Sequence, residues 1–179
     1  MGPVVVMLSG ASSAGKTTLA KALLPLLDPP AVLVEADSAF PAIHTSVDGD
    51  VEAPIVVFHR SLRTWADAGF TVVVDGSLPY GDGELRERCL DELRNHRTFV
   101  VGVTCSRGEL CRREGERPDP RLQGWAESQT DDVNHGLALL VTVDTSAAGP
   151  LELAQRVAGS ILATSETAEL GVQEPEPRW

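Results

Sequence analysis

The sequence predicts an α/β protein with a five-stranded parallel sheet and helices on both faces. Short apolar runs alternate along the chain with helix-length amphipathic segments, and several runs are apolar at consecutive positions. Strands with consecutive apolar residues are typical of a sheet that is covered on both faces. Alternation of strands and helices favours parallel strands joined by right-handed crossovers.

Five apolar runs are of strand length and rich in β-branched residues. They are PVVVMLS (3–9), AVLVEA (31–36), TVVVDG (71–76), TFVVGVTC (98–105) and LLVTVDT (139–145). The segments between and after them space their apolar residues as amphipathic helices do. We expect helices over residues 15–27, 53–69, 82–96, 106–117, 122–136 and 150–164.

We predict a single domain over residues 1–165. The chain has 179 residues, about the length of one domain, and its 42% of hydrophobic residues can supply a core. The last stretch, ETAELGVQEPEPRW (166–179), is acidic and contains prolines. Such a composition predicts a flexible C-terminal tail.

The charge of the chain argues against two classes of partner. The formal net charge is -11 and the pI is about 4.7, so no overall field attracts nucleic acid or an anionic membrane surface. No run approaches the ~20 apolar residues of a membrane span, and the first residues do not resemble an export signal. Three cysteines without C-x-x-C spacing favour reduced thiols. We therefore expect a cytoplasmic protein that binds neither nucleic acid nor membrane. The sequence is compatible with a homo-oligomer.

The segment SGASSAGKTT (9–18) predicts a site for nucleotide phosphates, because residues 10–17 satisfy G-x-x-x-x-G-K-[ST] between a strand and a helix. The backbone N–H groups of such a loop can surround a phosphate chain that larger side chains would hold away. The expected nucleotide-binding residues are Gly10, Ala11, Ser12, Ser13, Ala14, Gly15, Lys16, Thr17 and Thr18. Lys16, one of only two lysines, reaches the β- and γ-phosphates in this interpretation, and the Thr17 hydroxyl binds Mg²⁺. The predicted cofactors are ATP and Mg²⁺.

Two acidic residues follow predicted strands, where open α/β sheets bind their ligands. Asp75 ends the run TVVVD and is a candidate magnesium ligand beside Thr17, with a turn or N-cap aspartate as the alternative. Asp37 follows VLVEA and is a candidate general base for a hydroxyl acceptor. In a loose phosphoryl-transfer transition state the attacking oxygen becomes acidic late, so a carboxylate suffices as the base. The alternative for Asp37 is an aspartate that starts a helix.

Five of the 13 arginines lie in the lid segment, SRGELCRREGERPDPR (106–121). With four acidic residues the segment nets +1 in a chain whose total is -11. Arginines over the γ-phosphate would stabilise charge in the transition state. The alternative for each arginine is a solvated, salt-bridged helix face.

The sequence resembles the chloramphenicol phosphotransferase family of small P-loop kinases. The matching stretches are GASSAGKTT, EADS, VVVDG, VVGVTCSRGELCRREGERPDPRLQGWAESQ and TVDTS, in the same order over about residues 4–163. The resemblance implies an adenylate-kinase-like sheet order and ATP- and Mg²⁺-dependent transfer of phosphate to a hydroxyl. It also implies that Asp37 is the base and that Arg113 and Arg117 act from the lid segment. One departure is VNHG (133–136), in which His135 stands one place from the family's histidine.

The segment FPAIHTSVDGDVEAP (40–54) is dissimilar to the family, and we expect it to form one wall of the acceptor site. SLPYG (77–81) is expected on the other side. Aromatic and imidazole rings in these stretches and in the helix between them can stack on or pack against a small molecule. The candidates are Asp37, Phe40, His44, Phe58 and Tyr80, with Trp125 as a further ring.

Three functions are compatible with these residues. The first is a kinase that phosphorylates a hydroxyl of an antibiotic or related natural product, for resistance or self-protection. The second is a metabolic kinase for a nucleoside or another small molecule, and the third is a nucleotide-binding protein without transfer chemistry. Either enzyme should form ADP faster with an acceptor than without one, and should lose this on Asp37→Ala.

Overall fold

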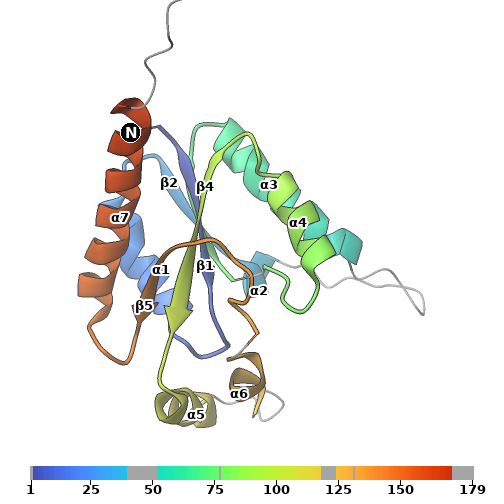
Figure 1. Ribbon diagram of the computed structural model, residues 1–179, viewed down its shortest axis with the longest axis vertical. Helices are drawn as coiled ribbons and strands as arrows, with labels where there is room; N and C mark the ends of the chain where they lie inside the picture. The colour runs from blue at the N-terminus through green and yellow to red at the C-terminus, as the bar shows by residue number, and fades with distance from the viewer. Residues whose placement is uncertain (1, 40–51, 77, 118–123, 131, 171–179) are drawn as a thin grey trace, which may run out of the picture.

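The computed structural model contains one central sheet of five strands, with helices packed on both of its faces (Figure 1). It describes residues 2–39, 52–76, 78–117, 124–130 and 132–170. The strands are β1 (Val4–Ser9), β2 (Ala31–Glu35), β3 (Thr71–Asp75), β4 (Arg97–Thr104) and β5 (Leu139–Asp144). They lie in the order β2-β3-β1-β4-β5, and every neighbouring pair is parallel. The predicted fold class is confirmed.

The helices follow the strands as the alternation in the sequence predicts. They are α1 (Lys16–Leu23) with a 3-10 turn (Leu24–Leu26), α2 (Ala36–Ala39), α3 (Glu52–Asp67), α4 (Gly83–Asp91), α5 (Arg107–Gly115), α6 (Trp125–Gln129) and α7 (Pro150–Leu170). No helix of the described residues has the length and apolar character needed to cross a bilayer.

Two apolar cores sandwich the sheet. On one face α1 and α7 share a core cluster that includes Leu19, Leu23, Val157 and Ile161. On the other face α3 and α4 cover the sheet (Figure 1), and Leu62 of α3 is fully buried there. Every residue of β1 is buried because this strand is central and covered from both sides.

The strand register brings the predicted acidic residues to one edge of the sheet. Asp75, at the end of β3, pairs with Leu8 of β1 on one side and with Glu35 of β2 on the other. The nucleotide loop leaves the carboxyl end of β1, and Asp37 follows β2 at the same edge. Ligand sites in parallel sheets form at this edge, so the fold itself gathers the candidate residues.

The structure differs from the predicted helices in three places. Of the helix expected over 122–136, the described residues form α6, and turn hydrogen bonds follow it, including one from Asp132 N–H to Gln129 O. Aspartate and asparagine side chains compete with helix formation, which accounts for this early end. The residues after α4 are also turns, whereas α7 continues past the expected end at residue 164. The domain boundary at residue 165 stays a prediction.

Candidate functional site

The loop between β1 and α1 requires glycine at two positions. A Cβ atom on Gly10 would lie 2.2 Å from the backbone oxygen of Val103, so β4 passes too close for any side chain. Gly15 precedes α1 with a φ of 94°, a left-handed conformation that L-residues rarely adopt. The close approach of β4 to Gly10 and the left-handed Gly15 therefore shape the loop whose N–H groups would meet a phosphate chain.

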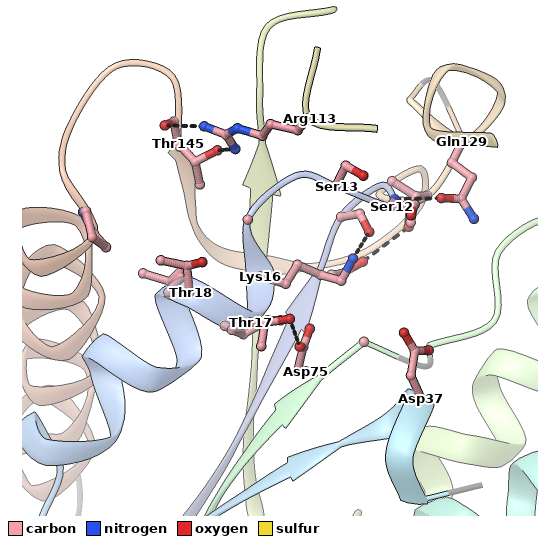
Figure 2. A pocket seen from close by; sticks show the side chains of 18 of the residues that line it. Ser12, Ser13, Lys16, Thr17, Thr18, Asp37, Asp75, Arg113, Gln129 and Thr145 are labelled. Carbon is pink, nitrogen blue, oxygen red and sulfur yellow. Dashed lines mark hydrogen bonds between the residues drawn. The ribbon is translucent and has the colours of Figure 1, made fainter. Parts of the chain in front are cut away.

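Lys16 folds over this loop and places its ammonium group inside it (Figure 2). Its Nζ donates to the carbonyl oxygens of Gly10 at 2.8 Å and Ala11 at 2.9 Å. Burial lowers the pKa of Lys16 from its ordinary value, the carboxylates of Asp75 and Asp37 oppose this shift, and Arg117 adds to it. The ammonium group therefore has two acidic residues and an arginine within electrostatic range.

The hydroxyl of Thr17 donates to a carboxylate oxygen of Asp75. These two oxygens come from the start of α1 and the end of β3, and they are hard donors of the kind that Mg²⁺ prefers. Within the described ranges, no cluster of three or more His, Cys, Asp or Glu residues could hold a metal ion. The pair fits a magnesium ion that takes its remaining ligands from phosphate oxygens and water, as Mg²⁺ usually does.

Asp37 lies at the mouth of the same cavity, in the short helix α2. The cavity has a volume of about 930 Å³, and Asp37, Lys16, Thr17 and Asp75 all line it. The Asp37 side chain is exposed, and Figure 2 shows it on the far side of Asp75 from Thr17. The structure thus brings the predicted base, the loop lysine and the candidate magnesium ligands to one cavity.

The two predicted lid arginines lie at different parts of the loop. Arg117 places its guanidinium 3.4 Å from the hydroxyl of Ser12. Arg113 instead donates to the Thr145 hydroxyl at 3.0 Å and to the Thr145 carbonyl at 3.2 Å, and its Nε donates to Glu109 at 2.8 Å. All three nitrogens of Arg113 are thus engaged with protein. Arg117 keeps the position expected for charge stabilisation near Lys16, whereas Arg113 fixes the loop that follows β5.

Ser13 lies at the centre of the nucleotide loop in a strained conformation. Its φ is 61°, in the left-handed region that non-glycine residues seldom occupy. Its hydroxyl oxygen is buried and has no hydrogen-bond partner among the described residues. A buried hydroxyl without a partner is costly. A phosphate oxygen in the loop could satisfy it.

The expected acceptor residues are only partly brought to the cavity. Tyr80 lines it, together with the apolar side chains of Ile55 and Leu78. Phe58 is 6% exposed and packs in the core beneath α3, because it shares a helix face with the buried Leu62. Phe40 and His44 lie outside the described residues, as does the side chain of Trp125.

Two residues of the cavity were not singled out from the sequence. Thr145 follows β5, accepts from Arg113 and donates to the Ala14 carbonyl at 2.6 Å. Its signal is its place after a strand, within the TVDTS stretch that matches the family. Gln129 accepts from the backbone N–H of Ser12 at 2.7 Å. It lies in a short polar helix and is the last residue of the VVGVTCSRGELCRREGERPDPRLQGWAESQ stretch that matches the family. No feature of its own marks it as a cavity residue.

The chain resembles known proteins both in sequence, through a family model, and in fold, through solved structures. The model of the family described as chloramphenicol phosphotransferase-like protein matches residues 3–161. Among curated protein sequences, none matches significantly.

Solved structures with the same fold include an APS kinase from Mycobacterium tuberculosis in complex with AMPPNP and APS. That structure has a TM-score of 0.69 at 16% identity, covering 90% of this chain and 98% of that chain. A gluconokinase from Sinorhizobium meliloti has a TM-score of 0.68 at 17% identity, covering 96% and 98%. The tunicamycin resistance protein of Deinococcus radiodurans has a TM-score of 0.63 at 18% identity, covering 89% and 95%. At these identities the likeness shows a shared P-loop kinase fold.

Proposed function

The chain belongs to the chloramphenicol phosphotransferase-like family and is a small-molecule kinase, and from this premise we propose that it transfers the γ-phosphate of ATP to a hydroxyl group of an antibiotic or related natural product. The observation that carries the proposal is the cavity that Lys16 and Asp37 both line. Burial lowers the pKa of Lys16, and the carboxylates of Asp75 and Asp37 oppose this shift. A cation for a phosphate and a base for an alcohol are thus within reach of each other. The resistance protein with the same fold is consistent with such an acceptor.

The reaction follows from the positions of these two groups. Asp37 accepts a hydrogen bond from the acceptor hydroxyl and takes its proton as the new oxygen–phosphorus bond forms. The bond between the γ-phosphorus and the bridging oxygen breaks, and ADP leaves. Lys16 and Arg117 stabilise the charge on the oxygens of the transferred group.

Magnesium fits this proposal through Thr17 and Asp75, whose oxygens already lie within hydrogen-bond contact. The bound ion neutralises phosphate charge. The Asp75 carboxylate orients the Thr17 hydroxyl by accepting its hydrogen bond, and it would hold the ion directly or through a water. Loss of this carboxylate should therefore raise the magnesium concentration that activity needs.

The charges of the cavity favour an acceptor without an anionic group. Every cation among its lining residues comes from the loop or from α5 and the residues after it, and the acceptor side contributes Asp37, Ile55, Leu78 and Tyr80. The sequence of residues 40–51 contains two aspartates and neither lysine nor arginine. Among the described residues of the acceptor side, a carboxylate or phosphate on the acceptor would meet no lysine or arginine, which is costly in a partly buried site. An apolar body with a hydroxyl fits the same lining.

A transfer assay tests the proposal. Wild-type protein, ATP and Mg²⁺ are incubated with neutral hydroxylated antibiotics, beginning with chloramphenicol, and in parallel with gluconate and shikimate. Mass spectrometry should find one added phosphoryl group on a neutral antibiotic, and Asp37→Asn should slow its formation by about 10²–10⁴-fold. Transfer to gluconate or shikimate alone would instead make the protein a metabolic kinase, and ATP binding without transfer to any compound would favour a non-catalytic role.

A further inference from the structure

Gln129, at the end of α6, joins the nucleotide loop to the acceptor side of the cavity. Its Oε1 accepts from the backbone N–H of Ser12 at 2.7 Å, and its Nε2 donates to the hydroxyl of Tyr80 at 2.9 Å. All three residues line the same cavity. Gln129 is only 9% exposed, so water competes weakly for these bonds.

The chemistry of the three groups fixes their orientation. A backbone N–H can only donate, so the amide oxygen of Gln129 must face Ser12 and the amide nitrogen must face Tyr80. The Tyr80 oxygen therefore accepts a hydrogen bond, and its own proton is available to a group in the cavity. Gln129 thus sets the direction in which Tyr80 can donate to an acceptor molecule.

A buried carboxylate holds the other end of α6. Glu114 of α5 is 4% exposed, and its two oxygens accept from the N–H groups of Gly124 at 2.7 Å and Ala126 at 2.8 Å. Hydrogen bonds to a buried carboxylate are among the stronger ones in proteins. A helix of five residues is not stable alone, so Glu114 and packing against α5 determine where Gln129 lies.

We infer that Gln129 is a positioning residue that transmits the arrival of nucleotide in the loop to Tyr80, an inference that rests on the proposed function. A terminal phosphate in the loop competes with Oε1 of Gln129 for the Ser12 N–H. The amide then moves, and the hydrogen bond from Nε2 to Tyr80 changes with it. Such coupling is reciprocal, so an acceptor bound to Tyr80 also alters the affinity for nucleotide.

The sequence offers a direct probe, because Tyr80 is the only tyrosine of the chain. Protein grown with tyrosine labelled with ¹³C at Cζ gives one NMR signal from this ring. We expect the signal to shift when the wild-type protein is saturated with AMPPNP and Mg²⁺. In Gln129→Met, which has a similar length but no amide, nucleotide should still bind and most of the shift should be lost.

Thr130→Ala is the matched control. Thr130 also lies at the end of α6, and its hydroxyl donates to the Ala126 carbonyl at 3.0 Å, so the substitution removes a hydrogen bond of this helix without touching Ser12 or Tyr80. Its shift should equal that of the wild type. An equal shift in wild type and Gln129→Met would overturn the inference and leave the proposed function standing. Calorimetry that finds no nucleotide binding to the wild type would overturn both.

A second measurement decides the matter even if Gln129→Met does not fold. Tyr80→Phe removes the hydroxyl that Gln129 contacts and leaves the loop itself intact. We expect it to change the dissociation constant of AMPPNP by about 2- to 10-fold, the effect of one hydrogen bond. Where Gln129→Met folds, the same substitution in its background should have no effect. An unchanged dissociation constant in the wild-type background would contradict transmission through Gln129.

Discussion

The two halves of the cavity are held in different ways. The nucleotide half is a backbone loop whose conformation is set by the close approach of β4 to Gly10 and by the left-handed Gly15. The acceptor half consists of side chains from separate segments, such as Asp37 after β2 and Tyr80 after β3. Phosphate chains are alike in all nucleotides, whereas acceptors differ. A rigid loop therefore suits the nucleotide half. Side chains that can be replaced one by one suit the acceptor half.

Removal of the base, Asp37, should lower activity more than any other substitution and should leave nucleotide binding unchanged. Asp37→Asn keeps the size of the side chain and cannot take a proton, so we expect kcat to fall by about 10²–10⁴-fold. Nucleotide affinity, measured by calorimetry, should stay close to the wild-type value because Asp37 lies outside the loop. A variant that loses nucleotide binding and turnover together would show that the halves are not separable in this way.

Removal of the loop cation should affect both binding and turnover. Lys16→Ala deletes the ammonium group that Gly10 and Ala11 orient, and we expect a loss of about 10²–10³-fold in kcat/KM with weaker nucleotide binding. Lys21→Ala is the matched control, because the other lysine of the chain forms an exposed ion pair with Glu35 at 3.1 Å. Exposed pairs contribute little, so this control should keep its activity. Full activity of Lys16→Ala would contradict the assignment.

Asp75 lies between the nucleotide loop and Asp37 (Figure 2), and its substitution tests the proposed magnesium site. Asp75→Asn weakens the oxygen that contacts the Thr17 hydroxyl. We expect the magnesium concentration for half-maximal activity to rise by about 10–100-fold, as is common when a metal site loses a supporting carboxylate. Titration of activity with MgCl₂ at fixed ATP measures this. An unchanged titration curve would show that Asp75 does not support magnesium and acts only as a turn or N-cap aspartate.

Substitutions of Arg117 and Arg113 should have the smallest effects, and they should change different kinetic constants. Arg117→Ala removes an exposed guanidinium near Ser12, and we expect kcat to fall by about 10-fold, less than for a buried donor because solvent screens this charge. Arg113→Ala releases Thr145 and the loop after β5, so it should mainly raise the KM for ATP. Steady-state kinetics with varied ATP separate these results. A fall in kcat for Arg113→Ala and a higher KM for Arg117→Ala would instead indicate that Arg113 contacts the γ-phosphate.

The fold and the nucleotide half could be predicted because their signals are local. The consecutive apolar residues of β1 and β3 and the spacing of glycines and lysine between β1 and α1 are visible in one short window each. Asp37 and Asp75 could be found because parallel strands end at one edge. The aromatic character of Phe58 predicts a contact with the acceptor, whereas its spacing from Leu62 puts it on a core face.

The rest of the cavity depends on contacts between residues that are far apart in the sequence. Gln129 and Ser12 are separated by 117 positions, and Arg113 and Thr145 by 32. An arginine in a polar helix has the same local pattern whether it faces phosphate, a threonine or water. Only the packing of α5 and α6 on the loop decides between these, and that packing depends on Glu114, whose burial no local pattern indicates.

The position of the acceptor oxygen tests the central claim most directly. Once the transfer assay has identified an acceptor, a crystal structure with that acceptor, AMPPNP and Mg²⁺ can be determined. We expect the hydroxyl oxygen to lie about 2.6–3.2 Å from a carboxylate oxygen of Asp37 and in line with the γ-phosphorus held in the loop. A hydroxyl that instead contacts another base, with Asp37 directed away from the acceptor, would contradict it.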